Sequence, residues 1–174
     1  MLRILCRNQS LKGFTLLELL IVIAIIGIAS AIIISGFTVG QVSREIEVAA
    51  REFATVVREA QSYALNGRQP SASVDPCLYG VSWGNGGSSY NIIYRDKNGC
   101  AAAAVSTFSS HTLQRGVTFN TASSSFFFTV PHATLSPAPA GGNYRVTVRK
   151  AGQSRSVCVY PSGNVTDVSG TVCP

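Results

Sequence analysis

Charged residues are scarce in this chain of 174 residues, and one long stretch has none. They make up 13% of the sequence, and no charge occurs between Glu18 and Arg44. Proline is restricted as well, because the first one is Pro70. Nothing therefore interrupts an apolar helix over residues 14–35. Such a helix would be about 30 Å long, which matches the hydrocarbon core of a bilayer.

Histidine and closely spaced cysteine are also lacking, which argues against an enzyme or a metal site. His111 and His132 stand apart in segments rich in serine and threonine, with no paired acid close in sequence. The five cysteines contain no Cys-x-x-Cys pair, a spacing typical of structural zinc sites. We expect neither an enzymatic activity nor a bound metal or other cofactor.

What is present at the N-terminus is a basic leader and one acid. Arg3, Arg7 and Lys12 precede the apolar run. By the positive-inside rule they place the N-terminus in the cytoplasm and everything after Arg44 outside. Glu18 lies inside the run, where a charge at the bilayer centre costs roughly 2.5–3.5 kcal/mol. An acid kept at such a cost indicates a function.

Two common interpretations of this segment fail. A secretory signal peptide would have a shorter apolar core, followed by a small-residue cleavage site. A lipoprotein signal at Cys6 would need small residues where Ile4 and Leu5 stand. A plain signal anchor is the remaining alternative, and it leaves Glu18 without a role.

The sequence Lys12-Gly13-Phe14-Thr15-Leu16-Leu17-Glu18-Leu19-Leu20-Ile21 resembles the class III signal of type IV pilins and type II secretion pseudopilins. The resemblance implies that prepilin peptidase removes residues 1–13 and methylates the new N-terminal residue, Phe14. It further implies that Glu18 pairs with the Phe14 amine of a neighbouring subunit during assembly. That amine would supply the partner that a buried carboxylate requires.

The apolar pattern continues beyond the predicted transmembrane and assembly helix at 14–40. Over 41–67, apolar residues recur every three or four positions, which predicts an amphipathic second half of the same helix. Asn66-Gly67 followed by Pro70 is a helix stop. Over 68–174 the period changes to two, and turns such as Gly84-Asn-Gly-Gly87 separate the runs. We expect six to eight antiparallel strands there.

The predicted fold class is therefore α+β, with one long N-terminal helix packed on an antiparallel β-rich head, as in the lollipop shape of pilins. The sequence Val157-Cys-Val-Tyr-Pro-Ser-Gly-Asn-Val165 follows a basic hairpin and precedes Cys173. It resembles the GspH/FimT branch of minor pilins and pseudopilins. That resemblance implies a head built from two sheets.

Four cysteines remain after loss of the leader: Cys77, Cys100, Cys158 and Cys173. An even number in an oxidising compartment predicts two disulfides. Three connectivities are possible. Cys77–Cys100 with Cys158–Cys173 is favoured, because each pair brackets a short segment rich in turns.

Two further surface features are predicted. Arg145 and Arg149 alternate along one strand, and with Lys150 and Arg155 across a turn they would form a basic hairpin able to contact DNA phosphates. FimT-type minor pilins that capture DNA carry Gly-Arg-x-Arg in this turn, and this chain keeps the glycine and the last arginine in 152–155. The alternative is a solvated hairpin. Three consecutive phenylalanines at 126–128 should leave at least one exposed or covering a neighbouring subunit.

The function expected from these resemblances is that of a minor pilin that primes or caps a type IV pilus after cleavage. Its partners would be prepilin peptidase, other pilins or pseudopilins through the N-terminal helix, and an inner-membrane assembly platform. It would cross the bacterial inner membrane once, with the head in the periplasm, before entering the filament. The alternatives are a type II secretion pseudopilin and a minor pilin that captures DNA for transformation.

Overall fold

The structure is a computed structural model that describes residues 13–97, 100 and 104–174, without the side chains of 31–39. The chain divides into two units, Met1–Gly40 and Gln41–Pro174. One helix, α1 (Leu16–Leu65), contains 50 residues. Its length follows from the absence of proline, since proline is the residue that most strongly breaks a helix.

The first unit contributes the beginning of α1. The backbone N–H of Glu18 donates to Thr15 Oγ1 at 3.2 Å, so Thr15 acts as the N-cap. Leucine, isoleucine and valine side chains from Leu16 to Ile28 are exposed on all sides. Judged by length and hydropathy, no helix among the described residues could cross a membrane. The predicted span at 14–40 includes 31–39, whose side chains lie outside the description, and it stays a prediction.

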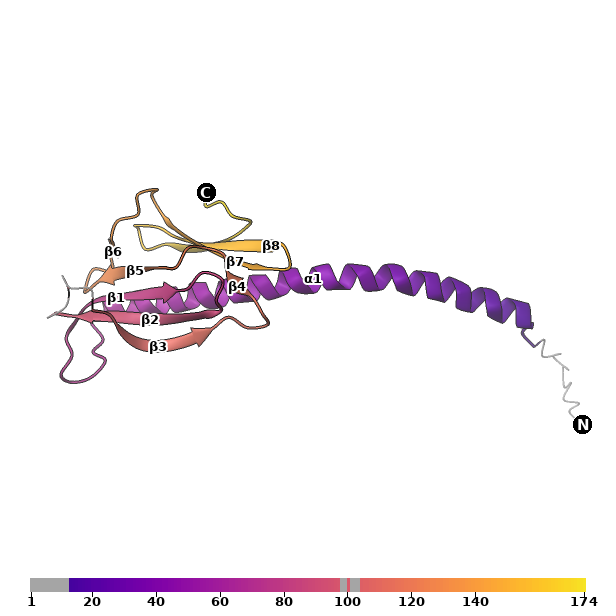
Figure 1. The fold of residues 1–174 in the computed structure, drawn as a ribbon, viewed down its shortest axis with the longest axis horizontal. Coiled ribbons are helices and arrows are strands. Elements are labelled where there is room, and N and C mark those ends of the chain that lie inside the picture. Colours follow the sequence, from indigo (N-terminus) through magenta and orange to yellow (C-terminus); the bar gives the residue numbers. More distant parts are fainter. Residues whose placement is uncertain (1–12, 98–99, 101–103) are drawn as a thin grey trace, which may run out of the picture. The chain divides into compact units, whose positions relative to one another are not determined.

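Two antiparallel sheets form the head, as Figure 1 shows. The five-stranded sheet has the order β3-β2-β1-β5-β6, with β1 (Pro76–Trp83), β2 (Ser89–Asp96), β3 (Ser106–Thr112), β5 (Ser124–Thr129) and β6 (Leu135–Ser136). The four-stranded sheet has the order β4-β7-β8-β9, with β4 (Thr118–Phe119), β7 (Tyr144–Lys150), β8 (Gln153–Val159) and β9 (Val165–Ser169). The predicted α+β class is confirmed. The described residues form nine strands, more than the expected six to eight, because a two-residue strand such as β6 is too short to give an alternating pattern in the sequence.

The second half of α1 supplies one wall of the core. Its buried residues are apolar and recur at helical spacing: Ile46, Ala49, Ala50, Phe53, Ala54, Val56, Val57, Ala60 and Ala64. The ring of Phe53, fully buried, meets Trp83, Tyr90 and Phe119 edge-on, with centroids 6.3, 5.3 and 5.4 Å away. Such edge contacts add to the burial of the ring itself.

The C-terminus of α1 is fixed by its own backbone. Gly67 has a φ of 57°, a conformation that glycine adopts without steric cost. The N–H of Arg68 then donates to the carbonyl of Tyr63 at 3.1 Å, which caps the helix. The helix stop predicted at Asn66-Gly67 is thus confirmed.

The prediction for the three phenylalanines is wrong. Phe126 and Phe128 are fully buried in the core, and Phe127, on the other face of β5, is only 5% exposed. Phe127 lies across Gly80 of β1, where a Cβ atom would come within 2.8 Å of its ring. The guanidinium of Arg95 covers the ring at 4.6 Å from its centroid. The alternation along β5 predicts which face Phe127 lies on, but not whether that face is exposed. Its burial depends on the residues of neighbouring strands, here Gly80 and Arg95.

Both disulfides lie in the head. Cys77 is bonded to Cys100, with their Cα atoms 6.1 Å apart, and Cys158 to Cys173, with their Cα atoms 5.9 Å apart. These are the two pairs that the sequence favoured. The first joins β1 to the segment after β2, and the second ties the C-terminal segment to β8.

Candidate assembly site and head surface

The predicted processing site lies in an open segment before α1. Residues 13–15 precede the helix and are exposed, and among the described residues no atom beyond the chain neighbours of Gly13 lies within 4 Å of a Cβ built on it. Phe14 is 83% exposed. A peptidase needs an accessible peptide bond, and Gly13 leaves one flank of this bond without a side chain. The local geometry between Gly13 and Phe14 is therefore compatible with cleavage.

Glu18 lies in the first turn of α1, four residues after Phe14. At this end of a helix a carboxylate is favoured by the positive end of the helix dipole. Among the described residues, no hydrogen bond or ion pair engages the Glu18 carboxylate. It is surrounded along the helix by exposed leucines, so a neighbouring apolar surface would bury it together with them. The arrangement can accept a cation from outside the chain.

In the head, two acids tie α1 to the four-stranded sheet. The carboxylate of Glu45 receives Lys150 Nζ at 2.7 Å and lies 3.9 Å from Arg115. Asp167 on β9 accepts two hydrogen bonds from Arg155, at 2.7 and 3.0 Å, and lies 3.9 Å from Arg51 of α1. The Lys150–Glu45 and Arg155–Asp167 pairs are partly buried, and the first joins residues 105 positions apart in the sequence.

The four basic residues of the predicted DNA-binding hairpin do not form one surface. In the β7–β8 register, Val148 lies opposite Arg155 and Lys150 lies opposite Gln153, and opposite residues share a face. Lys150 and Arg155 therefore lie on the face of β7 and β8 that carries the core valines, where they bind Glu45 and Asp167. Side chains alternate between the two faces of β7 as the sequence predicted. The alternation continues to Lys150 and places it on the face opposite to that of Arg145 and Arg149.

Arg145 and Arg149 lie on the opposite, outer face. Arg145 donates to the carbonyl of Thr171 at 2.7 Å, and Arg149 is exposed beside a polar hollow of about 410 Å³ at the hairpin tip. Only this pair of the four points outward. DNA binding stays a prediction.

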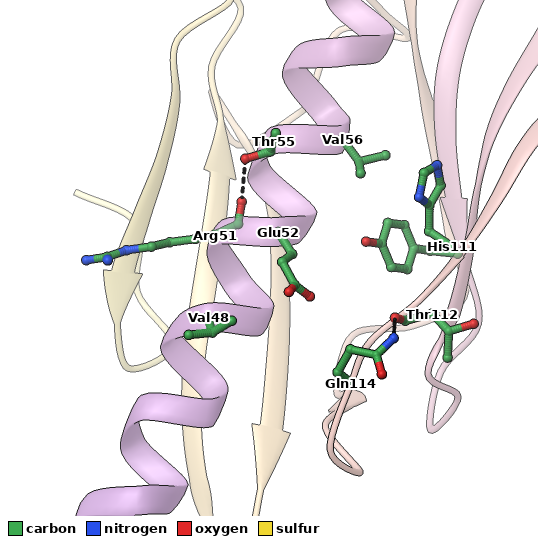
Figure 2. Close-up of a pocket in the computed structure, with 9 residues that line it drawn as sticks. Val48, Arg51, Glu52, Thr55, Val56, His111, Thr112 and Gln114 are labelled. Carbon is green, nitrogen blue, oxygen red and sulfur yellow. Dashed lines mark hydrogen bonds between the residues drawn. The ribbon is translucent and has the colours of Figure 1, made fainter.

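A second hollow, of about 580 Å³, lies between α1 and the end of β3 (Figure 2). Its lining combines Val48, Glu52 and Val56 of the helix with Tyr90, His111 and Gln114. The rings of Tyr90 and His111 are stacked, with centroids 5.4 Å apart. We call this hollow the α1–β3 groove.

The position of Tyr90 in the wall of the α1–β3 groove affects the pKa of its hydroxyl group. Burial is the main cause and the nearby Glu52 carboxylate the second, and together they raise the pKa of Tyr90 to about 12. His111 shares a hydrogen bond of 2.9 Å with the hydroxyl of Ser109. Among the described residues, no group of three or more His, Cys, Asp or Glu is placed to hold a metal ion.

Sequence reasoning missed this groove because its lining comes from three separate segments. The aromatic residues and His111 have no local pattern that sets them against the helix. The one local signal is Glu52 itself, an acid without an oppositely charged residue three or four positions away on the helix.

Comparison with known proteins gives two matches to protein families and one to a solved structure. The prokaryotic N-terminal methylation motif matches residues 10–34, and the type II transport protein GspH matches residues 49–163. A comparison with curated protein sequences found no match. The fold is similar to that of the minor pseudopilin EpsH from the type 2 secretion system of Vibrio cholerae, with a TM-score of 0.50 and 10% identity. That match covers 72% of this chain and 97% of the other.

The two family matches cover the two regions whose sequences resemble pilin-like proteins, the N-terminal signal and the head. The methylation motif covers Gly13, Phe14 and Glu18, and it implies prepilin peptidase processing and assembly with pilin-like subunits. The GspH match runs from the second half of α1 through β8. Since it spans more than half of the sequence, the chain belongs to the GspH family of pseudopilins and minor pilins.

Proposed function

We propose that this protein is a minor subunit that primes or caps a type IV pilus or a related pseudopilus. Its work is structural and not enzymatic. The observation that carries the proposal is Glu18, an acid with no partner among the described residues, in the first turn of an otherwise apolar and exposed helix. Pairing with a subunit's N-terminal amine explains both its position and its cost.

Cleavage before Phe14 creates the required cation. The peptidase takes the open segment 13–15, and the new ammonium of one subunit then neutralises Glu18 of the next. The exposed leucines and isoleucines of 16–28 pack against neighbouring helices at the same time. Each such side chain contributes about 1.5–3 kcal/mol when it is buried. Charge pairing fixes the axial register, and apolar contact supplies most of the attraction.

Before assembly the subunit is anchored in the inner membrane, with its N-terminus in the cytoplasm and its head in the periplasm. The three basic residues of the leader support that orientation. The two disulfides of the head support an oxidising compartment.

The second candidate is a subunit of a type II secretion pseudopilus. The GspH match and the EpsH-like fold favour it. Both candidates share the processing and assembly steps, and they differ in the machine that uses the filament.

The test of the shared steps is mass spectrometry of the mature chain purified from membranes. The expected N-terminus is N-methylated Phe14, and Gly13→Val should block cleavage because its side chain obstructs the extended substrate. Gly27→Val makes the same change within the helix, also in open space, and should leave cleavage intact. A mature chain that begins at Met1 would contradict the proposal.

Deletion of the gene separates the two machines. Loss of twitching motility with normal protein secretion supports the pilus, and loss of secretion with normal twitching supports the pseudopilus. Scoring transformation in the same strains tests the DNA-capture prediction.

A further inference from the structure

The α1–β3 groove is lined mainly by apolar and hydroxyl residues, with one acid, Glu52, and one cation, Arg51. Val48, which is 51% exposed, and Val56 line the helix side, and the stacked rings of Tyr90 and His111 line the strand side. Figure 2 shows Glu52 pointing from the helix toward the side of His111 and Gln114. A volume of about 580 Å³ is ample for a large side chain from another protein.

Glu52 differs from the other glutamates of the second half of α1. The other three have a partner within the chain: Glu45 binds Lys150 of β7, while Glu47 binds Arg51 and Glu59 accepts a hydrogen bond from Tyr63, both one turn further along α1. Among the described residues, no hydrogen bond or ion pair engages the Glu52 carboxylate. Arg51 also lines the groove, but in Figure 2 its guanidinium end extends to the other side of the helix, where it pairs with Glu47 and lies 3.9 Å from Asp167.

A lone carboxylate beside apolar and aromatic walls suits a cation with an apolar, planar body. The guanidinium of arginine stacks on aromatic rings and binds a carboxylate through two parallel hydrogen bonds, whereas lysine offers only a point charge. The amide of Gln114 uses one N–H for the carbonyl of Thr112, at 3.1 Å, so its oxygen can accept a further bond. An anion would meet Glu52 and be repelled.

We propose that the α1–β3 groove binds an arginine side chain of another pilin-like subunit in the same filament, with Glu52 as its counter-ion. The inference rests on the proposed function and names a contact for it beyond the N-terminal pairing. The groove lies on α1, the helix that carries the assembly motif. It borders β3, an edge strand of hydroxyl residues whose seven positions carry no acidic or basic group other than His111.

The experiment places p-benzoyl-phenylalanine at position 48 of the full chain, in its native host. Irradiation should crosslink it to another pilin-like subunit, at a peptide that contains an arginine. The same probe at position 65, also exposed on α1 but outside the groove, serves as the control site.

Substitutions that change the charge at position 52 then test whether this carboxylate binds the arginine. Glu52→Gln should lower the yield of the crosslink from position 48 roughly tenfold, as loss of a charge-assisted pair predicts. Glu59→Gln, the same change on the same helix outside the groove, should leave the yield unchanged. Glu52→Arg should abolish the crosslink, and the reciprocal change of the partner's arginine to glutamate should restore it.

Each other outcome overturns the inference. A yield that does not respond to Glu52→Gln would do so, as would a crosslinked peptide without arginine. A crosslink to a second copy of this chain or to a secreted protein would also contradict it, as would no crosslink from position 48. If the chain reaches the sheared filament fraction in these cases, the proposed function survives. If the unmodified chain is neither cleaved nor recovered there, both proposals fail.

Discussion

The two halves of α1 have the same backbone and opposite environments. Over 16–30 its apolar side chains are exposed, whereas over 41–65 one apolar stripe is buried almost completely in the head. Both halves are rich in apolar residues, so helix formation alone does not distinguish them. What differs is the partner: the second half has two sheets of its own chain.

Because of this difference, burial of the second half of α1 stabilises the folded head, whereas burial of the first half can stabilise only the assembled filament. The stripe around Phe53 contributes to folding of the head, because its contacts are intramolecular. The exposed residues of 16–28 can contribute only when another surface covers them. Changes in the two halves should therefore affect different measurements, and four predictions test that separation in order of expected effect.

The largest effect is expected for Glu18→Val, and on assembly alone. It leaves a neighbour's ammonium buried without a counter-ion, a loss of about 3–5 kcal/mol. Recovery of the subunit in the sheared filament fraction should fall at least a hundredfold by immunoblot, while cleavage before Phe14 and thermal unfolding of the head stay unchanged. Glu18→Asp, which keeps the charge, should retain part of the assembly. Normal recovery of Glu18→Val would contradict the pairing.

Phe53→Ala should have the converse effect. Removing a fully buried ring that contacts Trp83, Tyr90 and Phe119 should lower the free energy of unfolding of the head by about 3–5 kcal/mol. Urea denaturation followed by tryptophan fluorescence measures it, since Trp83 reports on the same cluster. Ile26→Ala in the exposed half should change that free energy by less than about 0.5 kcal/mol. Equal effects of the two changes would remove the distinction between the halves.

The disulfides also test the separation between folding of the head and assembly through the first half of α1, because both disulfides lie in the head. Replacing Cys158 and Cys173 by alanine opens a loop of sequence separation 15 and should destabilise the head by about 3 kcal/mol. Urea denaturation of the double variant measures the loss, and reduction of the wild type should lower stability further by opening Cys77–Cys100 as well. Peptide mapping without reductant that found four free thiols would refute the premise.

The smallest effect is expected from alkaline pH. Burial raises the pKa values of Tyr79 and Tyr90 to about 12, against 10.0 for the free side chain. The unfolded chain therefore releases these protons first, and the stability of the head should fall as the pH rises from 10 to 12. Tyr90→Phe should flatten that fall, because it removes one of the two groups whose pKa burial raises. A stability that stays constant over this interval would contradict the prediction.

Several elements of this fold were predictable from the sequence because their causes are local. The helix continues to Leu65 since no proline interrupts it, and Gly67 ends it through its own conformation. The pairs Cys77–Cys100 and Cys158–Cys173 follow from short separations across turns. The motif at Gly13, Phe14 and Glu18 is contiguous, so it could be recognised without any knowledge of the head.

The features that sequence reasoning missed depend on which strands are neighbours. Phe127 is covered because β1 places Gly80 beneath it and β2 supplies Arg95. Arg155 faces the core side of its sheet because the β7–β8 register sets it opposite Val148. No pattern within a single segment carries that information.

The sequence by itself determined the processing motif, the extent of the helix and the alternation of the strands, since each depends on residues within a few positions of one another. Only the tertiary structure decided that Lys150 and Arg155 bind the acids Glu45 and Asp167 and that Glu52 is left facing the α1–β3 groove. The physical reason is that ion pairs and the burial of side chains depend on residues that are close in space but belong to different segments. The repeat of apolar residues within one segment carries no information about them.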